Sequence, residues 1–206
     1  GIFQLSVPTG GGKTLASLRF ALHHAKEHNL DRIFYIAPYI TIIDQNARQV
    51  REILKDVDQD GNPLNNVLLE HHSNFVPQED GKNQHSLLAE NWDAPLVFTT
   101  QVQFLESLFA SGTRDNRRMH QLANSVIILD EVQMIPVEIT NMFTVALRFL
   151  VKICGASIVL CTATQPPLDN LPQEYRELHI PDQNKIIKNE ESLFRKLKRV
   201  EVQDAR

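Results

Sequence analysis

Close to its N-terminus the chain reads Ser6-Val7-Pro8-Thr9-Gly10-Gly11-Gly12-Lys13-Thr14. This stretch follows the mostly apolar run Ile2-Phe3-Gln4-Leu5 and precedes apolar residues at helical spacing, namely Leu15, Leu18, Ala21 and Leu22. A short strand, a glycine-rich turn and then Gly-Lys-Thr at a helix start form the context that a phosphate-binding loop requires. The stretch therefore predicts an anion-binding turn between a first strand and a first helix.

The residue types in this turn suit a nucleotide. Glycines let consecutive backbone N–H groups surround a phosphate because no Cβ stands in the way. The positive end of the helix dipole lies at the same anion. We expect Lys13 to place a full charge on the β- and γ-phosphates and the Thr14 hydroxyl to hold Mg²⁺. The alternative is a glycine-rich turn between strand and helix that binds no ligand.

The composition is that of an ordinary globular domain. The chain has 206 residues and a net charge of −4, so it carries no overall basic field, and any polynucleotide must be held by a local surface and backbone amides. Cys154 and Cys161 form no CxxC pair, which favours a reducing compartment. We find no signal peptide and no apolar run long enough to span a membrane. We therefore expect a cytoplasmic domain without a membrane partner.

Short apolar runs alternate with helical patterns along the chain. The expected strands cover residues 2–7, 32–37, 67–69, 96–99, 126–129 and 157–160. Helices are expected over residues 13–28, over the apolar positions Ile43, Ala47, Val50, Ile53, Leu54 and Val57, and after Pro136. In the last of these, Ile139, Met142, Phe143, Ala146 and Leu150 form a stripe that we assign to core packing. Strands that are apolar on both faces and separated by helices predict an α/β fold, with a mostly parallel sheet covered on both sides.

Two regions interrupt this alternation. Residues 57–93 are polar and contain Asp-Gly twice, so we expect an insertion there, mobile around residues 75–84. The C-terminal end is a charged helical pattern followed by a polar tail. We therefore expect one domain over residues 1–186 and a connector over residues 187–206.

A second candidate site lies at the end of the strand predicted over residues 126–129, where Asp130 and Glu131 follow directly. In an enzyme with a phosphate-binding loop, an acid at this place faces the bound Mg²⁺ and the next one positions or deprotonates a water. We assign Asp130 to Mg²⁺ and Glu131 to the water. A solvated turn is the alternative for the acidic pair alone. After the next strand comes Cys161-Thr162-Ala163-Thr164, which by itself also fits an ordinary strand end.

In order and spacing, these segments resemble motifs I, II and III of superfamily 2 helicases: Pro8–Thr14, Asp130-Glu131-Val132-Gln133 and Thr162-Ala163-Thr164. Helicase-type loops also tolerate Val7 where the strict phosphate-loop pattern has glycine. The residues in and around motifs I and II are most similar to the helicase part of the CRISPR-associated helicase-nuclease of type I systems. The segment Leu69-Glu70-His71-His72-Ser73-Asn74 is similar to that family as well. The resemblance covers nearly the whole chain, as the first of two RecA-like domains of a P-loop NTPase.

This resemblance implies roles for individual residues. The nucleotide ATP would be bound by Pro8, Thr9, Gly10, Gly11, Gly12, Lys13 and Thr14, and Mg²⁺ by Thr14 and Asp130. The catalytic set would be Lys13, Asp130, Glu131 and Gln133. Coupling to the second RecA-like domain would run through Thr162, Ala163 and Thr164, together with Gln133. Pro38 and Tyr39 of motif Ia and Thr100 and Gln101 of motif Ib would contact the backbone of single-stranded DNA, although for Pro38 and Tyr39 a strand-end turn is an equal alternative. A CRISPR surveillance complex is the implied partner in antiviral interference.

Several parts of that family are missing from the sequence. No His-Asp dipeptide occurs, so we interpret His23-His24 and His71-His72 as surface or packing residues and not as metal ligands. Motifs IV to VI and their arginine finger, worth roughly 10³–10⁵ in rate, are also absent. We therefore expect this chain alone to bind ATP and hardly to hydrolyse it.

Two other functions remain open at this point. The first is an RNA helicase, although Gln133 in place of Asp or His argues against the DEAD and DEAH groups. The second is a nucleotide-dependent switch for protein interactions. The acidic net charge and the polar residues 57–93 leave room for such a switch.

Overall fold

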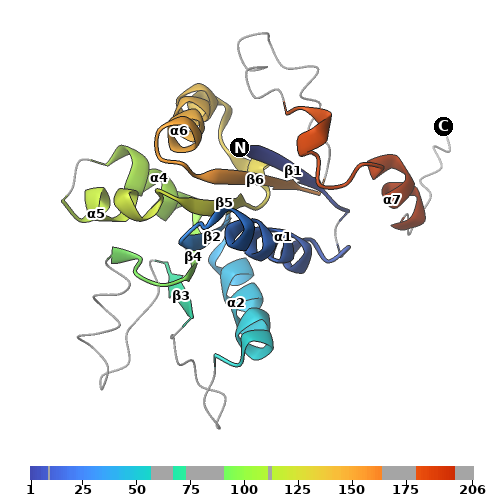
Figure 1. The fold of residues 1–206 in the computed structure, drawn as a ribbon, viewed down its shortest axis with the longest axis horizontal. Coiled ribbons are helices and arrows are strands. Elements are labelled where there is room, and N and C mark those ends of the chain that lie inside the picture. The colour runs from blue at the N-terminus through green and yellow to red at the C-terminus, as the bar shows by residue number, and fades with distance from the viewer. Residues whose placement is uncertain (9, 57–66, 73–90, 111–112, 164–179, 198–206) are drawn as a thin grey trace, which may run out of the picture.

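A computed structural model of the chain describes residues 1–8, 10–56, 67–72, 91–110, 113–163 and 180–197. Within them, six strands form one parallel sheet in the order β1-β6-β5-β2-β4-β3 (Figure 1). The strands are β1 (Ile2–Ser6), β2 (Arg32–Ala37), β3 (Leu68–His71), β4 (Leu96–Thr100), β5 (Ser125–Leu129) and β6 (Ser157–Thr162). The predicted parallel α/β sheet is confirmed.

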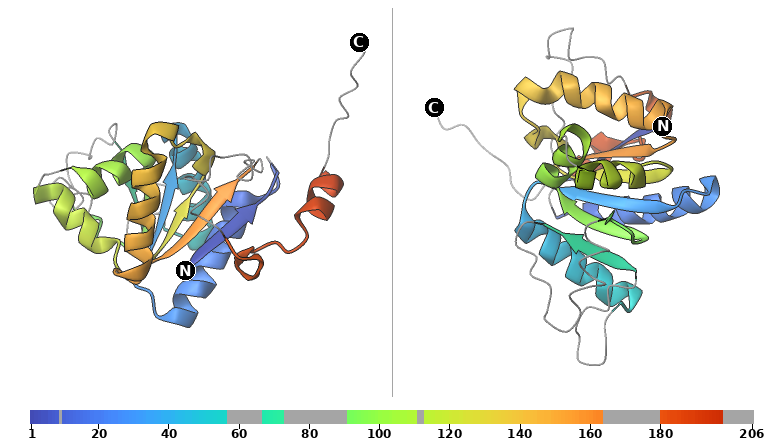
Figure 2. Two further views of the ribbon diagram at one scale, coloured as in Figure 1. Left: turned by 90° about the horizontal axis from the view of Figure 1, so that it is seen from above. Right: turned by 90° about the vertical axis from the view of Figure 1, so that its left-hand side faces the viewer.

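Helices cover both faces of the sheet (Figure 2). One face carries α1 (Lys13–His28) and α2 (Ile40–Leu54). The other carries α4 (Gln101–Phe109) and α6 (Thr140–Lys152), and α5 (Thr113–Gln121) packs against α4. Three short 3₁₀ turns, η2 (Val132–Met134), η3 (Val137–Ile139) and η6 (Asp182–Asn184), and the helix α7 (Glu190–Leu197) complete the described elements. None of the described helices is long and apolar enough to cross a membrane.

The central strands are apolar at consecutive positions because each face of the sheet has its own core. In β2, Tyr35 and Ala37 pack toward α1 and α2, whereas Phe34 and Ile36 pack toward α4 and α6. All four side chains are fully buried. A strand buried on both faces has no polar positions to offer, which is why its sequence reads as an apolar run.

The stripe predicted on α6 is partly wrong. Phe143 and Leu150 are buried as expected, but Met142 is 48% exposed. The inward positions are Phe143, Leu147 and Leu150, at the i, i+4 and i+7 spacing of one helix face. Met142 precedes Phe143 by one residue and therefore lies on a different side of the helix. An apolar stripe in the sequence that is wider than the buried face does not show which of its edges faces the core.

In α1 and α2, too, the apolar pattern of the sequence does not show which residues are buried. Leu22, expected on the apolar face of α1, is 52% exposed, while Ser17 is buried. Ile53, expected on the apolar face of α2, is also exposed, and Arg51 is buried in its place. The Arg51 guanidinium pairs with Asp56 at 3.2 Å and with Glu70 at 2.9 Å, so α2 ends on a buried ion-pair network that joins it to β3.

The C-terminal described segment runs back along the edge strand β1. Ile186 N donates to Gln4 O at 2.9 Å, and Leu193 of α7 is partly buried against the core. Part of the expected connector therefore packs on the domain, and the boundary at residue 186 stays a prediction. Thr9, Thr164, residues 73–90 with the expected mobile stretch, and the tail over 198–206 lie outside the described residues.

Candidate functional site

The carboxyl ends of all six strands lie at one edge of the sheet, where ligands bind in open α/β folds. Along this edge, the loop after β1 lies next to Ala163 after β6 and then Asp130 after β5. The ends of β2 and β4 follow with Pro38 and Thr100. The strand order therefore brings the candidate nucleotide residues and the candidate nucleic-acid residues into two neighbouring groups.

The glycine-rich loop has the backbone that its sequence predicts. Gly10 and Gly12 have φ values of 77° and 78°, in the left-handed region that favours glycine. Gly11 N donates to Pro8 O at 2.9 Å and closes the turn. Gly12 is the N-cap of α1 and has no side chain with which to cap the first N–H groups. The loop thus presents uncapped N–H donors at the positive end of a helix, as an anion-binding turn requires.

Val7 occupies the position where the strict loop pattern has glycine, and its side chain is buried. A Cβ added at Gly11 would lie 2.5 Å from Val7 Cγ1 and 2.9 Å from Pro8 O. The loop therefore folds tightly over the Val7 side chain. This contact explains how valine is accommodated here: it anchors the loop in the core, while the absence of a Cβ at Gly11 leaves room for it.

We predict that Gly11→Ala destabilises the protein by about 1–3 kcal/mol, because the added methyl group overpacks the space between Val7 and Pro8. Gly12→Ala is the matched variant, since a Cβ there meets nothing within 4 Å and only the positive φ is strained. Urea unfolding of both variants measures the difference. A larger loss for Gly12→Ala would contradict the close packing of Gly11, and adding Val7→Ala should partly restore Gly11→Ala.

Lys13 joins the loop to the acidic residues that follow β5. Its Nζ lies 2.9 Å from Asp130 Oδ1 and also pairs with Glu131 Oε1. Burial by itself lowers the pKa of Lys13, but the hydrogen bond to Glu131 and the charge of Asp130 outweigh it, so the pKa is raised. Lys13 is therefore fully charged at neutral pH. Motifs that are more than a hundred residues apart in sequence meet at one ammonium group.

Glu131 is held in an unusual backbone conformation. Its φ is 50°, in the left-handed region that non-glycine residues rarely adopt, and its N–H donates to Asp130 Oδ1 at 3.0 Å. Its carboxylate lies between Lys13 and the amide of Gln133, which donates to Glu131 Oε2. Strained backbone of this kind gathers at functional sites. Gln133 is thus brought to the nucleotide side by its contact with Glu131.

Residues of the third motif lie between the loop and the acidic pair. Thr162 ends β6 and is buried, and its carbonyl oxygen accepts from Val7 N at 3.1 Å. Ala163 follows directly at the sheet edge. A displacement of this strand end would therefore pull on the loop through the hydrogen bond from Val7 N to Thr162 O.

The sequence placed Tyr35 in the strand over residues 32–37 and did not predict its contact with the acidic motif. Its hydroxyl donates to Asp130 Oδ2 at 2.6 Å and lies 3.4 Å from Thr14 Oγ1. Burial, and then the charge of Asp130, raise the pKa of Tyr35 far above its usual value, so the phenol keeps its proton. A tyrosine within an apolar strand gives no sign of its partner, because Asp130 is 95 residues away along the chain.

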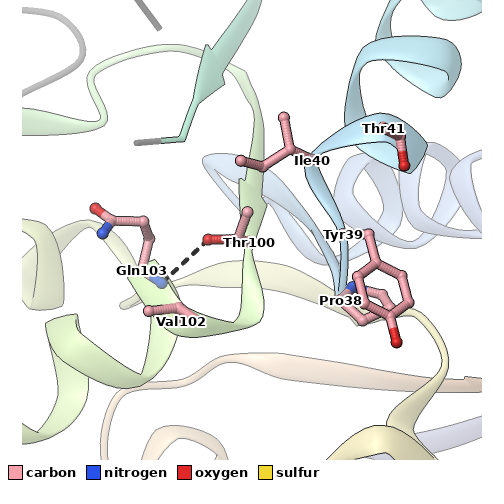
Figure 3. A pocket seen from close by; sticks show the side chains of 7 residues that line it. All are labelled: Pro38, Tyr39, Ile40, Thr41, Thr100, Val102 and Gln103. Atoms are coloured by element: carbon pink, nitrogen blue, oxygen red, sulfur yellow. Dashed lines mark hydrogen bonds between the residues drawn. The ribbon is translucent and has the colours of Figure 1, made fainter. Parts of the chain in front are cut away.

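A cavity of about 430 Å³ lies beside this group (Figure 3). One side comes from the end of β2 and the start of α2, and the other from the end of β4 and the start of α4. Its lining residues are Pro38, Tyr39, Ile40, Thr41, Thr100, Val102 and Gln103. Tyr39 is 53% exposed and Val102 is 59% exposed, so apolar surface is available at the mouth. Thr100 Oγ1 accepts from Gln103 N at 3.2 Å and caps α4.

Gln101 differs from its neighbours in this group. Its side chain is buried and donates from Nε2 to the main-chain oxygen of Asp130 at 3.2 Å. Three of the four residues expected to contact nucleic acid, Pro38, Tyr39 and Thr100, therefore line the cavity, and Gln101 points toward the acidic motif.

Each histidine pair has a member with contacts inside the protein, while His23 is exposed. His24 Nε2 lies 2.9 Å from Ser157 Oγ, and its ring stacks on Phe20. His72 Nε2 lies 3.2 Å from Asp44 Oδ1. The ligand atoms of Asp44, Glu70 and His72 all lie within 4.8 Å of one another and could hold a metal ion. The contacts of His72 with Asp44 and of Glu70 with Arg51 already account for this cluster.

Comparison with known proteins gives the family of the chain and its fold. The family model described as DEAD/DEAH box helicase matches residues 3–171. The CRISPR-associated nuclease/helicase Cas3 of Haloferax volcanii is 31% identical over 186 residues, which cover 81% of this chain and 19% of that protein. Crystal structures of T. fusca Cas3 with ADP and with AMPPNP both match with a TM-score of 0.62 and 21% identity. They cover 79% and 86% of this chain, and 19% and 21% of theirs, and show that the fold is shared. The match of this family model shows that Gln133 does not exclude the DEAD/DEAH family, against the expectation from the sequence. The chain spans about a fifth of the length of these proteins, and it belongs to the DEAD/DEAH box helicase family.

Proposed function

We propose that this chain is the ATP-binding motor domain of an ATP-dependent single-stranded DNA translocase or helicase that acts in CRISPR antiviral interference. The observation that carries the proposal is the contact of Lys13 with both Asp130 and Glu131, beside the cavity at the ends of β2 and β4. In the full-length protein, a second RecA-like domain would complete the nucleotide site. The similarity to Haloferax volcanii Cas3 supports a CRISPR surveillance complex as the partner.

The phosphate loop would hold ATP through the backbone of residues 8–14 and the Lys13 ammonium. Thr14 and Asp130 would hold Mg²⁺, and their oxygen atoms suit this cation. They also converge, because both contact the Tyr35 hydroxyl, at 3.4 Å and 2.6 Å. When bound there, Mg²⁺ would neutralise charge on the phosphates. Glu131 would orient the attacking water and accept its proton, and Gln133 would fix the Glu131 carboxylate.

Nucleic acid would occupy the cavity between Tyr39 and Val102. Aromatic rings stack on bases, and this stacking contributes about 1–3 kcal/mol per base without a need for positive charge. Backbone N–H groups at the starts of α2 and α4 would contact phosphates. This mode of binding fits a chain whose net charge is −4.

The proposal is tested by ATP hydrolysis of the full-length protein with and without poly-dT. We predict stimulation by poly-dT, and a roughly tenfold higher half-saturating concentration of poly-dT for Tyr39→Ala because a stacking surface is lost. Ile53→Ala is the matched control, since it removes an exposed apolar side chain from the far end of α2. Stronger stimulation by poly-U would identify an RNA helicase, and no stimulation by either polymer would contradict a translocase.

A further inference from the structure

We propose that Tyr35 is a positioning residue that orients both candidate Mg²⁺ ligands, Asp130 and Thr14, through its single hydroxyl group. This inference rests on the proposed function, since Mg·ATP is the ligand that these two residues would serve. It goes beyond that function by assigning a role to a side chain of β2 that lies in none of the three nucleotide motifs.

The first observation is that both oxygens of the Asp130 carboxylate accept hydrogen bonds from named donors. Oδ2 accepts the Tyr35 hydroxyl at 2.6 Å, a short distance typical of a hydrogen bond to a charged acceptor. Oδ1 accepts from Lys13 Nζ at 2.9 Å and from Glu131 N at 3.0 Å. Without the Tyr35 contact, only one of the two oxygens would be held, and the carboxylate could rotate about its last bond. The Tyr35 hydroxyl therefore sets which lone pairs of Asp130 are available to a cation.

The second observation concerns the direction of the hydrogen bonds at Thr14. The Tyr35 hydroxyl has one proton, which it donates to Asp130 in the hydrogen bond. Toward Thr14 Oγ1, at 3.4 Å, Tyr35 can therefore act only as an acceptor, so that Thr14 donates its proton. The lone pairs of Thr14 are then left for a cation. The Tyr35 hydroxyl oxygen also accepts from Asn46 Nδ2 at 3.4 Å, which connects α2 to this hydroxyl.

The third observation is that the Tyr35 ring is packed on all sides. It is fully buried, lies within the core between the sheet and the two helices α1 and α2, and stacks on Phe98 with centroids 4.7 Å apart. Neighbouring residues of β2 are apolar, and phenylalanine would fill nearly the same space. The hydroxyl is thus a buried polar group that packing does not require, and besides Asn46 its partners are the two residues expected to bind Mg²⁺.

We test this inference with Tyr35→Phe in the full-length protein, by calorimetric titration of ATP in Mg²⁺ and in EDTA. Outer-shell partners of metal ligands typically contribute 10- to 100-fold in metal affinity, so we expect the Mg²⁺-dependent gain in ATP affinity to fall by about tenfold. The affinity in EDTA should be unchanged, because Lys13 and the loop are intact. With Mn²⁺ in place of Mg²⁺ and ATP present, the weaker binding should appear in electron paramagnetic resonance as a larger signal from free Mn²⁺.

Ser125→Ala is the matched control, because it also removes one buried hydroxyl from the sheet, at the other end of β5, where Ser125 donates to Leu122 O. It should leave both titrations unchanged. Equal losses in Mg²⁺ and EDTA for Tyr35→Phe would show a structural role only and overturn the inference, as would an unchanged Mg²⁺ dependence. If Lys13→Ala instead binds ATP as the wild type does, the proposed function itself fails, so the two failures are distinguishable.

Discussion

Replacing Lys13 by alanine is expected to lower the affinity for Mg·ATP by about 100-fold or more. Loss of one partner from a buried, hydrogen-bonded charge contact costs about 2–5 kcal/mol, and Lys13 supplies the only side-chain ammonium of the phosphate loop in residues 6–14. The variant also leaves Asp130 and Glu131 facing the phosphates without the cation that now pairs with both. Repulsion between these carboxylates and the nucleotide adds to the loss.

Calorimetric titration of Mg·ATP measures this effect, and circular dichroism shows whether the fold is retained. Lys26→Ala is the matched control, because it removes an exposed lysine from the last turn of the same helix. Lys13→Arg keeps the charge but changes its geometry and should bind more weakly than the wild type. Unchanged binding by Lys13→Ala would falsify the assignment of the phosphate loop.

Much of the fold could be predicted because its boundaries are marked by local chemistry. The helix α1 begins after a run of glycines, and β2 ends before Pro38, and both elements have the predicted bounds. The apolar runs of β5 and β6 also predicted that these strands are covered on both faces, since a strand buried on both sides admits few polar residues. These signals act within a few residues and need no knowledge of tertiary packing.

What could not be predicted depends on partners that are distant along the chain. The burial of Arg51 follows from Asp56 and Glu70, which come together only when β3 pairs with β4. The exposure of Met142 follows from how α6 is rotated on the sheet. In both cases the residue type pointed the other way, and tertiary packing decided.

The candidate site divides in the same manner. Lys13, Asp130 and Glu131 could be selected from the sequence because each ends or begins an element at a recognisable position. The contacts of Tyr35 and Gln101 with Asp130 could not be predicted, although Gln101 was selected for another role, because they depend on the register of β2 against β5 and on the turn into α4. Side chains that support a site from within the core look like core residues until the strands are paired.

Glu131→Gln is expected to separate binding from hydrolysis. The amide keeps the size of the carboxylate, and its oxygen can still accept from Lys13, which also keeps its contact with Asp130. Lys13 loses one competing anion, so Mg·ATP should bind at least as tightly as in the wild type. An amide cannot take a proton from water, and loss of a general base typically costs roughly 10²–10⁴-fold in rate.

Calorimetry gives the affinity of the Glu131→Gln variant, and single-turnover ATP hydrolysis by the full-length protein gives the rate of the chemical step. Glu138→Gln is the matched control, because it makes the same change at an exposed glutamate in η3 and should leave both measurements unaltered. If Glu131→Gln instead loses binding, Glu131 holds the nucleotide or its metal, and the base must be another group. Hydrolysis at the wild-type rate would show that Glu131 is not the general base. The left-handed conformation of Glu131 would then serve only its contacts with Lys13 and Gln133.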